Sequence, residues 1–375
     1  MKQKIAILTQ PLRHNYGGII QNYALQRVLE DFGHETITIS REYDNPHSEI
    51  KVLASKLKSF LIRKVFQPNN PRYFDSSRIL VNNKAFIKKN INLSFNIKST
   101  AALKNYFDRE NFTAVVVGSD QVWRPKYSPN IFNFYLDFLG KSSKLKKIAY
   151  AASFGTEEWE YSYSQTNICS ELVQQFDAIS VREDSGINLC SQHLNRKDAV
   201  LVLDPTLLLN AEDYSQLIQQ PKKKLGLFTY VLDESEEKLT LIDRCAKQLN
   251  LEVAKNQSKY TKRNPKSNNI EDYIKPPIEG WLQGFRDAEF VITDSFHGTV
   301  FSIINNKPFI SLVNRERGAS RFQSILKKLG LEERLIYDFT EINLELLYSQ
   351  PNYAEVVPKL DRLRKESKDF LLKNL

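Results

Sequence analysis

The sequence contains few cysteines and few histidines, and this shortage excludes several classes of site. Three cysteines, Cys169, Cys190 and Cys245, lie far apart in a chain of 375 residues. Their odd number and wide spacing argue against a disulfide framework or a zinc site, and they fit a reducing cytoplasm. None of the five histidines has a partner at HExxH or similar spacing, so we expect no metal centre.

Long apolar runs and the common catalytic glycine motifs are also missing. No uninterrupted apolar run approaches the roughly 20 residues of a membrane span, and the N-terminal stretch "MKQKIAILTQ" has no signal-peptide cleavage pattern. The sequence lacks GxGxxG, GxxxxGK(S/T) and GxSxG motifs. These absences exclude a dinucleotide fingerprint, a Walker loop and a nucleophile elbow.

The chain is basic, with a formal net charge of +9, and its Lys and Arg residues are scattered. A nucleic-acid-binding protein would concentrate such charge beside aromatic residues or in a recognisable module, so we expect no nucleic-acid partner. A solvated basic surface, anionic substrates and a membrane surface stay open as explanations.

Strand and helix patterns alternate along most of the chain. The run "KIAILT", the helical spacing of "IIQNYALQRVLEDFG" and the alternation of "HETITIS" predict strand, helix and strand, the start of a parallel α/β sheet. A second series of strands and helices begins after "DPTLLLNAEDYSQLIQQPKKKLG". Because a domain typically takes roughly 100–200 residues, we predict two α/β domains, at 1–208 and 209–345, and a C-terminal helix at 346–375.

The basic, Asn-rich stretch from Asn45 to Leu103 is harder to assign. Within it, Glu49–Phe66 has apolar residues near one helical face, which Lys64 interrupts, and basic residues opposite. This pattern predicts an amphipathic helix. It either packs on the first domain or also touches a membrane surface.

Polar loops follow several of the predicted strands, and ligands of open parallel sheets bind beyond the carboxyl ends of strands. In "HNYGGIIQ", Gly17 and Gly18 precede a helix and form either an anion site or a plain tight turn. In "VVVGSDQVW", the polar residues and Trp123 form either a sugar platform or a helix cap with a buried tryptophan. Arg182 in "SVREDSG" is either a ligand of an anion or the partner of a neighbouring carboxylate.

The loop "TDSFHGT" carries His297 at the end of the buried run "EFVIT". We expect Gly298 and Thr299 to open the next helix, which places His297 near a helix N-terminus. The helix dipole there disfavours a protonated imidazole, and a bound anion would reverse this bias. The loop predicts either a catalytic histidine or a structural helix cap.

Taken together, these motifs resemble those of the polysaccharide pyruvyl transferase family, bacterial enzymes of surface-glycan synthesis. The motifs that carry the resemblance occur in the same order through nearly the whole chain: "NYGGIIQNYALQRVLEDFGHE", "VVVGSDQVWRP", "YAASFG", "ISVREDSG", "VLDPTLLL", "VITDSFHGTVFSIINNKPFI" and "RFQSIL". The resemblance implies two Rossmann-like domains that face each other across a cleft, as in GT-B glycosyltransferases, with the C-terminal helix crossing back.

The resemblance also implies phosphoenolpyruvate as donor substrate, no further cofactor, and a sugar or lipid-linked oligosaccharide as acceptor, so that a pyruvate ketal and phosphate form. Contact with the inner face of the membrane would bring the protein to lipid-linked acceptors. His297 matches the family's functional histidine. The candidate substrate-binding residues are Asn15, Gly17, Gly18, Gln21, Ser119, Asp120, Arg182, Asp294, Ser295, Gly298 and Arg317.

One position departs from the family pattern. Some members carry an arginine two residues before the histidine, where this chain has Ser295. Arg315, Arg317 and Arg321 are candidates to supply the missing cation. Two alternatives stay open: a GT-B glycosyltransferase that uses a nucleotide sugar, and a non-catalytic glycan-binding protein.

Overall fold

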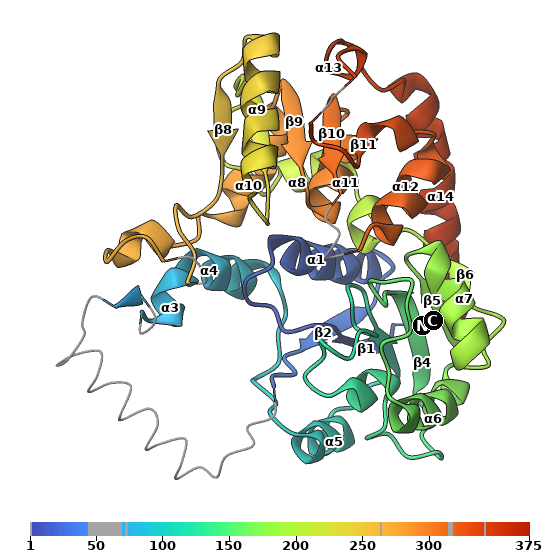
Figure 1. Cartoon of the computed structure of the whole chain (residues 1–375). Helices are drawn as coiled ribbons and strands as arrows, with labels where there is room; N and C mark the ends of the chain where they lie inside the picture. Colours follow the sequence, from blue (N-terminus) through green and yellow to red (C-terminus); the bar gives the residue numbers. More distant parts are fainter. Residues whose placement is uncertain (1, 44–69, 72–73, 263–264, 314–317, 341–342) are drawn as a thin grey trace.

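The strands of the computed structural model form two parallel sheets, one in each half of the chain (Figure 1). The structure describes residues 2–43, 70–71, 74–262, 265–313, 318–340 and 343–375. The predicted helix at Glu49–Phe66, as well as Arg315 and Arg317, lie outside these residues. The two sheets face each other across a cleft, which confirms the predicted α/β fold with two Rossmann-like units.

The first sheet has six strands in the order β2-β1-β3-β4-β5-β6. These strands are β1 (Lys4–Leu8), β2 (Glu35–Ile39), β3 (Ala114–Val117), β4 (Lys146–Ala152), β5 (Ala178–Val181) and β6 (Val200–Leu201). The helices and 3-10 turns between them are α1 (Tyr16–Asp31), α3 (Ser76–Ile79), α4 (Val81–Asn90), α5 (Thr100–Arg109), η3 (Ile131–Tyr135), α6 (Tyr163–Leu172), η4 (Val173–Gln175) and α7 (Asp184–His193). The central strand β3 is buried throughout, as its unbroken apolar sequence requires when helices cover both faces.

The second sheet has five strands in the order β11-β10-β9-β7-β8. These strands are β7 (Leu227–Tyr230), β8 (Val253–Lys255), β9 (Phe290–Thr293), β10 (Phe309–Leu312) and β11 (Leu335–Ile336). The helices and turns that lead into this half or belong to it are η5 (Pro205–Leu208), α8 (Ala211–Ser215), α9 (Glu236–Leu249), η6 (Ile270–Tyr273), α10 (Ile278–Asp287), α11 (Phe296–Ile304), α12 (Ser320–Leu329), η8 (Glu332–Arg334) and α13 (Glu345–Tyr348).

Helix α1 lies between the two sheets, and it is buried on nearly every side (Figure 1). At its first residue, the Tyr16 hydroxyl donates to the carbonyl oxygen of Pro276 in the second half, at 2.6 Å. The Tyr16 ring also packs 6.0 Å from that of Trp281. Because most of its residues are buried, α1 forms part of the interior between the two domains.

The last helix, α14 (Tyr353–Asn374), crosses back from the second domain to the first, as predicted. Near its start, the Tyr353 hydroxyl donates to the carbonyl oxygen of Lys307 at 2.6 Å. Near its end, the Leu203 amide donates to the Ser367 hydroxyl at 2.9 Å. The largest hydrophobic cluster joins both sheets with α1 and α14, since it includes Ile5, Phe228 and Leu371.

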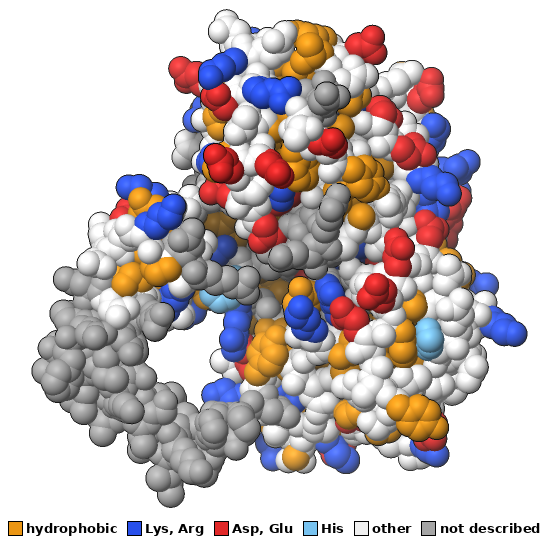
Figure 2. Space-filling model, viewed as in Figure 1, with side chains coloured by type: hydrophobic (Ala, Val, Ile, Leu, Met, Phe, Trp, Pro, Cys, Tyr) orange, Lys and Arg blue, Asp and Glu red, His pale blue; other side chains and the backbone are white. Residues whose placement is uncertain are grey.

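The surface carries mixed charge. On the face shown in Figure 2, Lys and Arg side chains alternate with Asp and Glu rather than gathering in one patch. Among the described residues, no helix is both long enough and apolar enough to cross a membrane.

Candidate active site

A cavity of about 430 Å³ lies between the two domains, where the carboxyl ends of the strands of both sheets meet. The first domain lines it with the loop after β1, the first turns of α1 and the loop after β3. The second domain contributes the loop between β9 and α11 and the start of α12. Of the predicted site residues, Asn15, Gly18, Gln21, Asp120, Asp294, Ser295 and His297 line the cavity.

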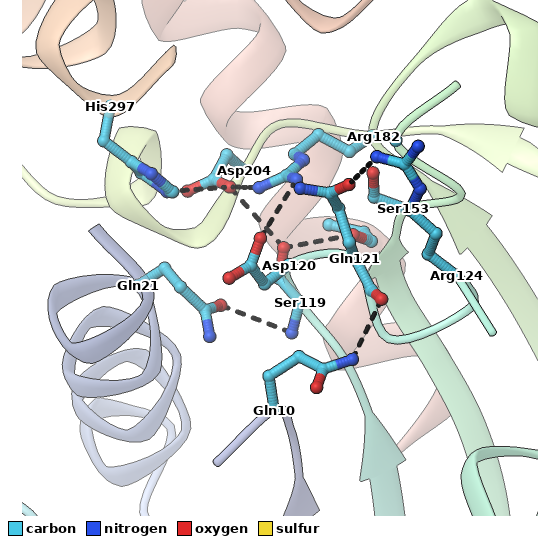
Figure 3. Close-up of polar contacts among 12 residues, drawn as sticks. Gln10, Gln21, Ser119, Asp120, Gln121, Arg124, Ser153, Arg182, Asp204 and His297 are labelled. Atoms are coloured by element: carbon cyan, nitrogen blue, oxygen red, sulfur yellow. Dashed lines mark hydrogen bonds and ion pairs between the residues drawn. The ribbon is translucent and has the colours of Figure 1, made fainter. Parts of the chain in front are cut away.

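His297 lies in the first turn of α11 and is buried, with about 5% of its surface exposed. Its Nε2 atom faces the carboxylate of Asp204, 3.6 Å from Oδ2 (Figure 3). The other edge of the ring lies against Gly17, because a Cβ built on Gly17 would overlap Nδ1. His297 therefore joins the two domains across the cleft.

Helix α11 begins three residues earlier than the sequence indicates. The prediction placed its start at Thr299, but the helix begins at Phe296. Ser295 is the N-cap, and its hydroxyl accepts from the Gly298 amide at 3.4 Å. Gly298 packs against Thr293, whose side chain would overlap any Cβ there. His297 is consequently a helical residue that the cap and the preceding strand hold in place.

Asp204 precedes η5, directly after the last strand of the first sheet, and it is buried. Its Oδ1 accepts from the Thr206 amide at 3.0 Å and from the Thr206 hydroxyl at 2.6 Å. Its Oδ2 accepts from Nη1 of Arg182 at 2.6 Å. Burial alone would raise the pKa of Asp204, but His297 and Arg182 outweigh it and hold this pKa below its ordinary value.

Arg182 lies behind the cavity wall, and three carboxylates surround its guanidinium. Besides Asp204, Nη2 lies 3.5 Å from Oδ1 of Asp120, and Nε lies 4.0 Å from Oε2 of Glu183. Burial lowers the pKa of Arg182, yet these carboxylates raise it overall. Its surroundings are therefore those of the ion-paired alternative that the sequence left open.

Asp120 places a carboxylate of the first domain at the cavity wall. Its Oδ2 accepts from Nδ2 of Asn15 at 3.3 Å. Ser119, in contrast, does not line the cavity. Its hydroxyl is directed to the carbonyl oxygen of Ala151 at 3.0 Å and to Oδ2 of Asp204 at 3.5 Å. The Ser119 amide donates to Oε1 of Gln21 at 3.3 Å (Figure 3). Ser119 and Gln21 thus hold the loop after β3 against α1.

Asp294 holds a neighbouring loop in place. Its carboxylate accepts from the amides of Leu232 at 2.6 Å and Asp233 at 3.1 Å. It also forms a buried ion pair with Nζ of Lys238 at 2.7 Å. Lys238 lies in the first turn of α9, where its sequence context is that of an ordinary surface lysine. Its partner is 56 residues away, so no local pattern could reveal the pair.

Arg321 is the described member of the three arginines that could replace the cation missing at Ser295. It lies in the first turn of α12, lines the cavity and is buried. Burial and the nearby Arg182 lower the pKa of Arg321 to about 10, so it stays cationic at neutral pH. The guanidinium carbons of Arg182 and Arg321 lie 4.8 Å and 5.7 Å from the ring centre of Phe296.

Of the two alternatives for Trp123, the structure shows the buried tryptophan and not the sugar platform. Trp123 is fully buried, its indole N–H donates to the carbonyl oxygen of Phe134 at 3.1 Å, and its ring stacks on Tyr135. Two tyrosines line the cavity instead, Tyr43 and Tyr127. The Tyr43 hydroxyl donates to the carbonyl oxygen of Tyr127 at 2.8 Å. Neither tyrosine was predicted from the sequence, because both occur in loops without regular spacing.

The family model for polysaccharide pyruvyl transferases matches residues 15–316, which is most of the chain. The chain belongs to this family. Transferases of polysaccharide synthesis make up the family, and its name implies a polysaccharide acceptor. No curated protein matches the chain.

Solved structures are similar to this pyruvyl transferase family member over nearly the whole chain. The S. aureus MnaA–UDP complex is 13% identical with a TM-score of 0.50, covering 98% of this chain and 91% of its own. UDP-GlcNAc 2-epimerase from Neisseria meningitidis bound to UDP-GlcNAc is 11% identical with a TM-score of 0.49. The match covers 100% of this chain and 99% of the epimerase. Arabidopsis thaliana UGT89C1 complexed with quercetin is 10% identical with a TM-score of 0.49. The match covers 98% of this chain and 94% of UGT89C1. At such identities the likeness concerns the fold alone.

Among the described residues of this pyruvyl transferase family member, no three His, Cys, Asp or Glu side chains gather as metal ligands. His297 and Asp120 line the cavity, as do His14 and Asp294, and Asp204 lies directly behind His297. The buried cation on the cavity wall is Arg321. These groups can exchange a proton and hold a small anion.

Proposed function

We propose that the protein transfers the pyruvyl group of phosphoenolpyruvate to two hydroxyls of a sugar in a surface-polysaccharide precursor. The product is a pyruvate ketal, and phosphate is released. The observation that carries this proposal is the meeting of His297 and Arg321 in one interdomain cavity, in a chain of the polysaccharide pyruvyl transferase family.

The second domain supplies the donor half of the cavity. Phosphoenolpyruvate has a carboxylate and a phosphate, and an arginine can bind either with two parallel hydrogen bonds. Arg321 is a buried cation beside the N-terminus of α11, and a helix N-terminus favours anions. A bound anion would also offset the repulsion between Arg321 and Arg182. Arg321 thereby takes the role of the arginine that other members carry at the position of Ser295.

The first domain supplies the acceptor half. Tyr43 and Tyr127 line the mouth of the cavity beside Arg13 and Gln10. An aromatic ring with nearby polar groups suits the apolar face and the hydroxyls of a sugar. Nε2 of Gln10 donates to the carbonyl oxygen of Gln121 at 2.9 Å (Figure 3). It also donates to the Ser128 hydroxyl at 3.0 Å, and the two bonds fix this wall.

The chemistry needs one proton donor and one proton acceptor. The methylene carbon C3 of the donor gains a proton, and an acceptor oxygen bonds to C2. The bond between C2 and the phosphate oxygen then breaks, and the second acceptor oxygen closes the ketal. Of the two hydroxyl protons, one ends on C3 and the other leaves with phosphate. His297 accepts and returns these protons as general base and acid.

The donor can be tested before the acceptor is known. Phosphoenolpyruvate should raise the melting temperature of the protein and bind in calorimetry, whereas UDP-sugars should not. With a panel of glycosides that offer hydroxyl pairs, phosphate release and an acceptor mass increased by pyruvic acid less water would support ketal formation. Release of UDP from a nucleotide sugar would instead support a glycosyltransferase.

The same proposal allows a lipid-linked acceptor at the inner face of the membrane. Flotation with anionic vesicles at low salt tests the membrane contact expected from the sequence. Absence of binding would limit the acceptor to sugars that reach the protein in solution.

A further inference from the structure

Asp204 and Arg182 form a buried pair directly behind His297. Both side chains are almost completely inaccessible, with 0% and 1% of their surfaces exposed, and neither lines the cavity. A role as substrate ligand therefore does not follow from their position. Their contacts lead to the imidazole instead, since Oδ2 of Asp204 lies 2.6 Å from Nη1 of Arg182 and 3.6 Å from Nε2 of His297.

Nε2 of His297 is buried and makes no hydrogen bond with the described residues. A buried polar atom without a partner is costly, because it has lost its water. The nearest carboxylate oxygen is that of Asp204, which lies just beyond hydrogen-bond distance. A proton on Nε2 is the arrangement that turns this close approach into a favourable contact, because the ionised carboxylate can only accept.

We propose that Asp204 is a positioning residue that holds the proton of the neutral His297 ring on Nε2. This leaves Nδ1, the nitrogen beside Gly17 at the cavity, to exchange protons with the substrates. Arg182 acts through Asp204, because its guanidinium keeps the carboxylate ionised and fixed. The catalytic part of this inference rests on the proposed function; the assignment of the tautomer does not.

Charged groups from other elements lie around His297. Asp204 precedes η5, with Arg182 at the end of β5 behind it. Asp120 in the loop after β3 pairs with Arg182, and Arg321 of α12 lines the same cavity. Of these groups, the one with a carboxylate oxygen within 4.0 Å of a His297 nitrogen is Asp204, so its replacement is the selective test.

Asp204→Asn should shift the tautomer toward Nδ1–H, because it removes the negative charge that faces Nε2. The Thr206 amide donates to Oδ1 of Asp204 and Arg182 donates to Oδ2, and both groups can only donate. An asparagine therefore meets a donor on either side. In both orientations the variant lacks the carboxylate that favours a proton on Nε2.

The experiment measures imidazole nitrogen shifts in ¹⁵N-histidine-labelled protein, at a pH where the ring is neutral. His297→Asn identifies the signal by its loss. We expect the Nε2–H tautomer in the wild-type protein and a larger share of the Nδ1–H tautomer in Asp204→Asn. Glu183→Gln is the matched control, because Oε2 of Glu183 also faces Arg182 while its Oε1 accepts from the Ser153 hydroxyl and the Phe154 amide. This variant should keep the Nε2–H form.

Steady-state kinetics provide the second readout. Asp204→Asn should lower kcat on the order of 10²-fold or more, within the range of positioned acid–base catalysis, with the KM for phosphoenolpyruvate nearly unchanged. Arg182→Lys should also reduce kcat more than it changes KM. A direct donor ligand would show the opposite, with KM raised most.

An Nδ1–H tautomer in the wild-type protein would overturn the proposal, and so would an Asp204→Asn variant with wild-type kcat. If Asp204→Asn fails to fold, as shown by circular dichroism, the wild-type tautomer and Asp204→Glu decide instead; the glutamate should keep the Nε2–H form. If phosphoenolpyruvate is not a substrate, the proposed function fails, while the tautomer still decides the role of Asp204.

Discussion

Gly17 of the first domain lies against the imidazole ring of His297 of the second, so closely that a Cβ at position 17 would overlap Nδ1. This contact explains why the sequence needs glycine here, although the residue is helical. The sequence-based alternatives for Gly17 were an anion site and a tight turn. In the structure, the absence of a side chain at Gly17 lets the His297 ring approach the start of α1.

Gly17→Ala should therefore impair the protein without weakening α1, since alanine favours a helix by about 1 kcal/mol over glycine. The added methyl group must displace His297, and such overpacking costs about 1–3 kcal/mol. We expect turnover to fall on the order of 10²-fold, as for a misplaced acid–base group. In Gly18→Ala the new Cβ would lie 3.1 Å from Oδ2 of Asp120, and the loss should be smaller. Equal losses in phosphate-release assays would contradict this explanation.

His297→Ala should reduce turnover roughly 10²–10⁴-fold, the usual yield of positioned acid–base catalysis. His297→Asn should retain donor binding, because an amide can donate a hydrogen bond, but it should be nearly inactive because it cannot carry a proton. His193→Asn is a suitable control, since His193 stacks on Trp159 in the first domain. Wild-type turnover in both His297 variants would leave this residue a structural part of α11.

Arg321→Lys should weaken phosphoenolpyruvate binding by about 1.5–3 kcal/mol, the range for hydrogen bonds to charged groups, because an ammonium lacks the planar fork of arginine. Calorimetric titration measures this directly, with the exposed Arg362→Lys on α14 as control. An unchanged affinity in Arg321→Lys would assign the donor to other cations.

The pair of Arg182 and Asp204 should contribute to stability in a pH-dependent way. The pKa of Asp204 is lowered on folding, so its stabilisation is complete above the ordinary pKa of about 4 and is lost as pH falls below it. Asp204→Asn should cost about 3–5 kcal/mol at pH 7, as expected for a broken buried ion pair. In urea unfolding, the difference from wild type should stay constant from pH 7 to 5 and shrink toward pH 3. A constant difference down to pH 3 would mean that Asp204 is not ionised at neutral pH.

The sequence allowed the layered fold to be predicted, because strands such as Ala114–Val117 and Phe290–Thr293 are short apolar runs followed by polar residues. It also allowed the loops at the sheet edges to be identified, since their position follows from parallel topology. His297, Asp120 and Asn15 were found in this way, and all three line the cavity.

The partners of these residues could not be predicted. Arg182 and Asp204 are 22 residues apart, and His297 and Asp204 are brought together only when the domains face each other. Local patterns also cannot tell whether a charged group meets solvent or another charge. For this reason Asp294 was expected to bind substrate, although its carboxylate is paired with Lys238 and two loop amides.

The hydrophobic cluster that contains Ile5, Phe228 and Leu371 has a consequence for folding. On the side that faces α1, both sheets pack against the same hydrophobic core, to which α1 and α14 also contribute. The two halves should thus not melt independently, as domains joined by a flexible linker do. Calorimetry should show a single cooperative transition, and a fragment that ends before β7 should expose apolar surface and aggregate when expressed alone.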